Sequence, residues 1–249
     1  MIEIAISLAV IGFALVAIIG VLPLGLNVQK ENREDTLINQ DASLFMSAIR
    51  NGAQGMDDLV NYVMAITNYA TQCNSAGMAT HPPSTYWYTP NNSYPPGFAL
   101  TNGYRIIGLL STTKYIPMPT GNGNFVSNYV VASIRCLSGA VSDKFPQNNA
   151  ALQDLAFSYR MISEVVPFGT DYHAQSWVPP NLQNNLHEVR LTFRWPLAEG
   201  TRAPGRQVFR TLAGGFLQKA NEPAFPPNPS QPSPYDLYFF APGTYVKAP

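Results

Sequence analysis

The chain opens with a segment that has no charged side chain between Ile4 and Gln29. Its apolar core reads IAISLAVIGFALVAIIGVLPLGL. At about 1.5 Å of rise per residue, a helix of this length crosses the apolar core of a bilayer, which is about 30 Å thick. A helix that is apolar on all sides is stable only in lipid or at the centre of an assembly. The beginning of the chain is therefore expected to leave water.

A cleaved secretory signal peptide is the alternative for such a segment. A signal peptide has a basic region in front, a short apolar stretch and a small-residue cleavage site behind it. The sequence has no basic residue before Ile4, its apolar stretch is longer than that of a signal, and no such cleavage site follows. We therefore expect a retained helix.

The helical pattern continues after the apolar run. A charged stretch begins at Lys30, and beyond it apolar residues recur at roughly helical spacing. These residues are Leu37, Ile38, Leu44, Phe45, Ala48 and Ile49. Gly52 and Gly55 are plausible stops. The pattern predicts one long helix to about Asn51, whose second half lays an apolar stripe on a following globular domain.

Two features inside the apolar half carry information. Glu3 places a carboxylate at the edge of a membrane segment, where charge is costly and usually functional, although a position in interfacial water would need no partner. Gly20, Pro23 and Gly25 lie close together. Because proline removes a helix hydrogen bond and glycine lowers helix propensity, these three residues predict a kink or break.

This N-terminal segment resembles the class III signal segment of type IV pilins and of the pseudopilins of type II secretion systems. The resemblance rests on residues 1–6 (MIEIAI) and on the 20–25 stretch with Pro23. In that family a prepilin peptidase removes a basic leader, the new N-terminus is methylated, and the helices leave the inner membrane to form a filament core. The family glutamate pairs with the N-terminal amine of a neighbouring subunit, so the resemblance assigns Glu3 and Met1 to assembly. Because the family glutamate is the fifth mature residue, we expect the mature chain to start two residues before Met1, and a subunit with a shifted register is the alternative.

The rest of the chain predicts a globular head. Segments rich in β-branched residues or with period-two alternation predict strands at 129–136, 156–166, 186–195 and 205–217. A run from Asp57 to Tyr69 predicts a second helix with acidic residues in its first turn. Residues 80–103 have the composition of a long loop, and 104–111 form a short strand or helix. We expect an α+β fold, in which the long helix packs on an antiparallel sheet with long Pro/Gly-rich loops.

The C-terminal residues 220–249 hold many of the prolines and cannot form a helix or an inner strand. They form either a disordered appendage or a segment that docks on its own head or on a neighbouring subunit. Docking is favoured by a cluster of aromatic residues. The cluster consists of Tyr235, Tyr238, Phe239, Phe240 and Tyr245. The expected domains are 1–52 (helix), 53–219 (head) and 220–249 (tail).

The two cysteines, Cys73 and Cys136, have no metal-ligand spacing. Outside the cytoplasm a disulfide between them is expected, and it would stabilise the head by roughly 2–4 kcal/mol. Two buried free thiols are the alternative.

Two surface features suggest carbohydrate. Residues 91–93 (NNS) match the N-glycosylation sequon, which makes Asn91 a possible modification site. Residues 86–88 (YWY) form either a platform on which sugar stacks or a packed aromatic loop.

No pattern in the chain predicts catalysis. Nucleophile elbows, phosphate-binding loops and dinucleotide motifs are absent from the sequence, and the histidines have no ligand spacing. These histidines are His81, His173 and His187. Scattered acids such as Asp154, Glu164 and Glu188 could form a glycosidase-like pair, but nothing favours that over solvated strand faces. Zero formal net charge and scattered basic residues disfavour nucleic-acid binding. We expect no enzyme activity, no metal and no cofactor.

The sequence thus leads to a structural subunit that polymerises through its N-terminal helix into an extracellular type IV pilus-like filament. A charged fraction of only 12% suits packing against identical copies. The expected partners are those copies, the inner membrane before assembly, the prepilin peptidase and the pilus assembly machinery. A minor pseudopilin of a type II secretion-like machine, or a membrane-anchored extracytoplasmic binding domain, is the alternative.

Overall fold

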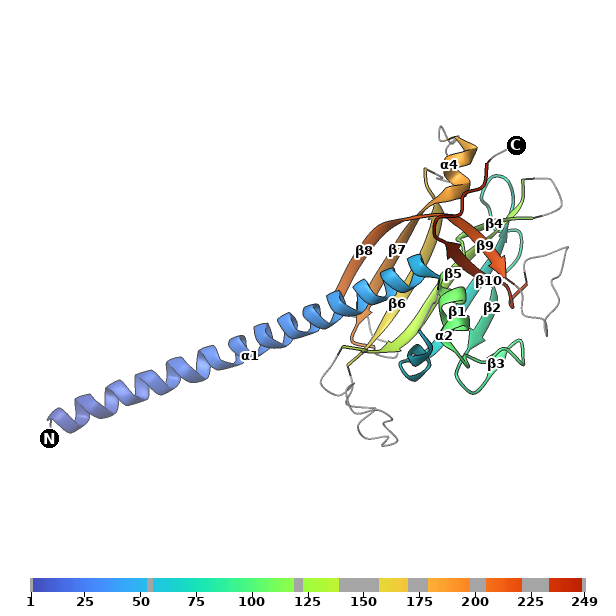
Figure 1. Ribbon diagram of the computed structural model, residues 1–249. Coiled ribbons are helices and arrows are strands. Elements are labelled where there is room, and N and C mark those ends of the chain that lie inside the picture. The colour runs from blue at the N-terminus through green and yellow to red at the C-terminus, as the bar shows by residue number, and fades with distance from the viewer. Residues whose placement is uncertain are drawn as a thin grey trace. The chain divides into compact units, whose positions relative to one another are not determined.

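The computed structural model describes residues 2–52, 56–118, 123–138, 157–169, 179–197, 205–220 and 233–247. The chain divides into two compact units, Met1–Gln40 and Asp41–Pro249. One helix, α1 (Ile2–Asn51), contributes to both units (Figure 1). The second unit, the head, is built mainly of antiparallel strands, so the fold is α+β as expected.

In the first unit, α1 is a continuous helix. The break expected at Gly20, Pro23 and Gly25 is not found, since α1 runs from Ile2 to Asn51 as one helix, and a kink there stays a prediction. A proline inside a helix removes one hydrogen bond, and its ring crowds the carbonyl four residues earlier, at a cost of about 3 kcal/mol. Adding residues to an existing helix is favourable, whereas restarting one requires a costly nucleus. The loss at one proline is therefore absorbed within a long helix.

The described part of the head forms an eight-stranded antiparallel sheet with the order β3-β2-β1-β5-β6-β7-β8, in which β4 also pairs with β5 (Figure 1). The strands are β1 (Val63–Cys73), β2 (Ser84–Tyr88), β3 (Ser93–Tyr94), β4 (Tyr115–Pro117), β5 (Phe125–Arg135), β6 (Ser158–Pro167), β7 (Leu186–Trp195) and β8 (Gly205–Gly214). A second, two-stranded sheet pairs β9 (Phe216–Ala220) with β10 (Leu237–Ala241). Besides the end of α1, the described residues of the head contain the helices η1 (Asp57–Asn61), α2 (Gly103–Leu110) and α4 (Pro180–Asn185).

The core of the head lies on one face of the large sheet, which we call the inner face. The last turns of α1 bury Ala42, Phe45, Ala48 and Ile49, so the apolar stripe predicted for this part of the helix is confirmed. Helix α2 and strand β10 complete the layer above the sheet. A Cβ atom built on Gly108 of α2 would lie within 3 Å of the Leu237 and Phe239 side chains of β10, so a larger residue at position 108 would push these two elements apart.

The strands predicted at 129–136, 156–166, 186–195 and 205–217 correspond to β5, β6, β7 and β8. The predicted second helix is wrong, because residues 57–61 form the 3-10 helix η1 and Val63–Cys73 forms β1. Apolar residues in this segment do recur near helical spacing, but β1 gains hydrogen bonds from β2 on one side and β5 on the other. The 80–103 segment also contains β2 and β3, and Gly103–Leu110 is a helix rather than a strand.

The proposed C-terminal appendage belongs to the head. Leu237–Ala241 forms β10, in which Tyr238, Phe239 and Phe240 are buried. This stretch has no proline, so none of its residues lacks the N–H donor that pairing with β9 requires. The aromatic cluster thus docks on its own head, except Tyr245, which is exposed. Residues 221–232 lie outside the described residues.

Candidate functional site

The first candidate site is the apolar half of α1. Ile2–Gly20 has a mean hydropathy of 2.7, and none of it is buried within the chain. By length and composition it is long and apolar enough to cross a membrane. Its large side chains project on all sides of the helix, and Phe13 is 80% exposed. The N-terminal half of α1 therefore has no partner for its apolar surface inside its own unit.

Glu3 lies in the first turn of this segment. Its backbone carbonyl accepts a hydrogen bond from the Ser7 hydroxyl at 2.8 Å. Within the described residues, the Glu3 carboxylate has no ion-pair partner. Met1, the other residue assigned to assembly, lies outside the described residues.

The segment of α1 from Lys30 to Thr36 has the polar surface of a water-exposed helix. Lys30 and Glu34 form an (i, i+4) pair with Nζ 3.8 Å from Oε1, and the Thr36 hydroxyl donates to the Asn32 carbonyl. An exposed pair of this kind contributes only about 0.3–0.5 kcal/mol. The helix therefore changes from an apolar to a polar surface well before it reaches the head.

Asp41 fixes the place where α1 joins the head. It is fully buried, and among the described residues its carboxylate accepts four hydrogen bonds. The donors are the Leu137 and Ser138 amides at 2.9 and 3.1 Å, the Ser138 hydroxyl at 2.6 Å and the Tyr159 hydroxyl at 2.8 Å. Burial, and then the adjacent carboxylate, raises the pKa of Tyr159, which remains a donor at neutral pH.

Sequence reasoning missed Asp41, although a signal was present. Asp41 lies three residues after Ile38 and four before Phe45, on the apolar stripe of the helix. A carboxylate on such a stripe must find donors when the stripe is buried, because an unsatisfied buried charge is very costly. The donors come from the end of β5 and the start of β6, which the helical pattern alone does not identify.

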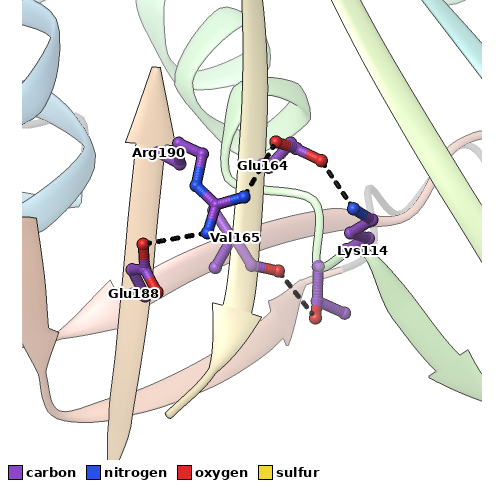
Figure 2. A network of polar contacts seen from close by, with 6 residues as sticks. Lys114, Glu164, Val165, Glu188 and Arg190 are labelled. Atoms are coloured by element: carbon purple, nitrogen blue, oxygen red, sulfur yellow. Dashed lines mark hydrogen bonds and ion pairs between the residues drawn. The ribbon is translucent and has the colours of Figure 1, made fainter. Parts of the chain in front are cut away.

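The acids Glu164 and Glu188 are tied to basic residues on the face of the sheet opposite the core (Figure 2). Lys114 Nζ lies 2.6 Å from Glu164 Oε1, and the Arg190 guanidinium lies 3.7 Å from Glu164 and 3.1 Å from Glu188. A longer contact of 3.8 Å joins Arg210 to Glu188. This arrangement accounts for both carboxylates as members of an ion-pair network. Asp154, the third acid considered, lies outside the described residues.

The expected disulfide is not formed: Cys73 and Cys136 are both buried free thiols. Cys73 ends β1 opposite Phe125, while Cys136 follows the other end of β5. At about 3.3 Å per residue, the distance from Phe125 to Cys136 is roughly 35 Å, far beyond the 4.4–6.8 Å that a disulfide spans between Cα atoms. Burial also raises the pKa of the Cys73 thiol.

The 86–88 aromatics do not act as one platform, because the strand pleat separates them. Tyr88 is buried and donates to the Pro234 carbonyl at 2.5 Å, whereas Trp87 is on the opposite face. Tyr86 and Tyr88 line a small cavity of about 50 Å³ together with Asn68 and Asp236. One oxygen of Asn68 and one of Asp236 have no hydrogen-bond partner among the described residues, and the cavity has room for about one or two waters.

The remaining predicted positions have simple environments. Asn91 is exposed in the turn between β2 and β3, but the sequon hydroxyl of Ser93 is buried and donates to the Pro95 carbonyl. His187 is buried against the Phe240 ring, and burial lowers its pKa to about 4. His81 is exposed, and His173 lies outside the described residues. No cluster of three potential metal ligands occurs in the part of the chain that is described.

Comparison of the chain with protein-family models, with curated proteins and with solved structures finds no match.

Proposed function

We propose that this chain is a structural subunit that polymerises through α1 into a type IV pilus-like filament, after residence in the inner membrane. The observation that carries the proposal is the exposure of Ile2–Gly20, an apolar helical segment with no burial inside the chain. Such a surface needs an apolar environment that the chain does not supply. Lipid provides it before assembly, and a bundle of identical helices provides it afterwards.

Glu3 supports assembly over simple anchoring. An unpaired carboxylate near the start of an apolar helix is costly once the helix leaves the interfacial water. In a filament, the N-terminal amine of an adjacent subunit offers an opposite charge, so that the two charges are neutralised together. A helix that only anchors the head has no such requirement.

The head supports the proposal because it forms its own core without the apolar segment of α1. Residues 41–249 form one compact unit with their own core. A head of this kind can be displayed in repeated copies on the outside of a helical bundle. Contacts between different surfaces of identical subunits do not close on themselves and produce open fibres.

The test is electron microscopy of material sheared from the surface of cells that express the chain, with mass spectrometry of its N-terminus. We expect filaments containing a processed, methylated subunit. Glu3→Ala should abolish filaments while the chain remains in the membrane. Glu31→Ala, on the exposed polar part of the same helix, is the matched control and should leave filaments unchanged.

A membrane-anchored extracytoplasmic domain is the competing function. It predicts that Glu3→Ala is tolerated, that no filaments are found and that the N-terminus is unmethylated. That combination would overturn the filament proposal.

A further inference from the structure

The sheet has a second face, opposite the core, which we call the outer face. In adjacent antiparallel strands, directly opposed residues project to the same side. Ile66 is opposed to Tyr88 on β2 and to Ala132 on β5, and all three are buried, which defines the inner face. The alternate positions of the same strands, such as Thr67 and Trp87, therefore project from the outer face.

Two cross-strand aromatic pairs are on this outer face. Trp87 on β2 is directly opposed to Tyr94 on β3, and Tyr69 on β1 is directly opposed to Tyr129 on β5. The Tyr69 and Tyr129 ring centroids are 6.2 Å apart. Because Tyr69 is opposed to Thr85, two residues before Trp87, the pairs are diagonal neighbours. We call these four side chains the aromatic platform.

The platform is open to solvent. The exposed fractions are 38% for Trp87, 56% for Tyr94, 40% for Tyr69 and 43% for Tyr129. Other aromatic side chains of the head, such as Tyr88 and Tyr159, are buried, and outside the platform, among the described residues of the head, only Tyr104 and Tyr245 are exposed to a similar degree. Four large rings that remain exposed side by side are available for a ligand rather than for the fold.

The strands that carry the platform are uncharged around the four rings, and charged side chains begin on the adjacent strand β6, where Arg160 is directly opposed to Ser133. The other outer-face positions of β1, β2 and β5 in register with the four rings carry small or hydroxyl side chains. They are Ala65, Thr67, Thr71, Thr85, Ser127, Val131 and Ser133. The same face over β6, β7 and β8 is charged, with Arg160, Arg194 and Arg206 directly opposed to one another. The platform is thus suited to a neutral ligand with apolar faces and hydroxyl edges.

We propose that the aromatic platform binds a neutral glycan. A pyranose ring has a face of C–H groups that packs on an aromatic ring, and its hydroxyls can exchange hydrogen bonds with threonine and serine side chains. Adjacent strands about 4.8 Å apart place the rings along a line that successive sugar units can follow. The platform belongs to the head alone, so the proposal does not depend on filament assembly.

The size of the platform argues against a protein partner. A stable protein interface covers about 800 Å² on each side, whereas four aromatic side chains that are about half exposed offer roughly 300–400 Å². Acidic glycans and DNA are disfavoured at the four rings, since the outer-face positions around them on β1, β2 and β5 carry no basic residue and the nearest arginine on this face, Arg160, is on β6 opposite Ser133.

The experiment measures binding of the full-length chain, in a detergent without a sugar headgroup, to an array of neutral hexose and N-acetylhexosamine oligosaccharides. Uronate- and sialate-bearing oligosaccharides and double-stranded DNA are included as acidic ligands. We expect binding to neutral oligosaccharides. Trp87→Ala and Tyr129→Ala should each weaken it about tenfold or more, because each removes one stacking surface. Trp87→Phe, which retains a ring, should recover most of the loss.

Val208→Thr and Leu212→Thr are the matched controls, because they change exposed apolar side chains on β8, in the charged half of the same face. They should leave binding unchanged. Thermal unfolding by circular dichroism identifies variants that misfold, and Tyr94→Ala, at the end of a short strand, provides an independent measurement.

Three outcomes would overturn the proposal. They are the absence of binding to neutral oligosaccharides, binding to acidic oligosaccharides or DNA alone, and neutral binding that survives in correctly folded Trp87→Ala and Tyr129→Ala proteins. The second outcome would place the binding site of the outer face at Arg160, Arg194 and Arg206 instead of at the platform.

Discussion

The apolar half of α1 and the core of the head use similar side chains in opposite ways. In Ile2–Gly20 none of the isoleucines, leucines and valines is buried within the chain. In the head, residues of the same kinds are enclosed by α1, α2 and the sheet, as at Phe45, Leu110 and Val165. The head completes its own core, whereas the apolar half of α1 buries none of its surface within the chain. Stability of the head and placement of the helix should therefore respond to different mutations.

The largest expected effect is on the placement of the helix. The double substitution of Ile11→Arg and Leu15→Arg puts two charges in the middle of the apolar segment, at about 2.5–3.5 kcal/mol each in a membrane. Flotation of membranes in a density gradient should show that the chain is no longer retained. Val208→Arg with Leu212→Arg, on the exposed face of β8, should not change retention. Equal retention of both variants would contradict the assignment of Ile2–Gly20 to lipid.

The next largest effect is on the stability of the head, to which only the C-terminal part of α1 contributes. Phe45 is fully buried in the head, and Phe45→Ala should lower the free energy of unfolding by about 3–5 kcal/mol through the cavity it leaves. Unfolding of the head in denaturant, followed by circular dichroism, measures this loss of free energy. Ser43→Ala, on the exposed side of the same turn, should change it by less than about 0.5 kcal/mol. Similar effects of the two substitutions would mean that the end of α1 is not docked.

Removing the Asp41 carboxylate, which binds α1 to the sheet, should lower the free energy of unfolding slightly less than Phe45→Ala does. Asp41→Ala leaves the Leu137 and Ser138 amides and the Tyr159 hydroxyl without an acceptor, which should cost about 3 kcal/mol. In a double-mutant cycle, Tyr159→Phe should cost less in the Asp41→Ala background than in the parent, since its partner is already absent. Strict additivity would show that the Tyr159–Asp41 hydrogen bond does not contribute.

A smaller effect depends on pH. Burial lowers the pKa of His187 from 6.5 to about 4, so the unfolded chain binds the proton more readily between these values. Stability should therefore fall as the pH decreases below about 6.5, with about 2 kcal/mol lost between pH 7.5 and pH 5. Unfolding at several pH values, compared between the parent and His187→Gln, isolates this contribution. A parallel pH dependence in both proteins would exclude His187 as its source.

The smallest expected effect is that of a reducing agent on the head. Because Cys73 and Cys136 lie at opposite ends of the β1–β5 pair, reductant should not change the unfolding midpoint. Mass spectrometry under non-reducing conditions should find two free thiols. A mass deficit of two hydrogens would contradict the register of β1 and β5.

The sequence predicted well those elements whose signal is local. The apolar run, the stripe containing Phe45 and Ile49, and the alternation in β7 are all periodic patterns, and all correspond to observed elements. Prediction was poorer for Val63–Cys73, because a short apolar run is compatible with a helix or a strand until its neighbours are known. The β10 segment was missed because the surrounding prolines concealed a short run with none.

The candidate sites divide in the same manner. Glu3 and the apolar helix are evident from one stretch of sequence. Asp41, by contrast, depends on donors at positions 137, 138 and 159, and the aromatic platform depends on strands β1, β2, β3 and β5 being in one register. The 86–88 motif indicated part of the platform. Because successive residues of a strand project to opposite faces, only Trp87 of the three belongs to it.

The sequence by itself determined that the chain has a long N-terminal helix, whose first half is long and apolar enough to cross a membrane, and a largely β-stranded head. These follow from hydrophobicity and period, which are properties of neighbouring residues. Only the tertiary structure decided that Cys73 and Cys136 are far apart, that the C-terminal aromatics complete the core, and that Trp87, Tyr94, Tyr69 and Tyr129 share an exposed face. The reason is that strand register joins residues distant in the chain, and a shift of one residue would move each side chain to the opposite face.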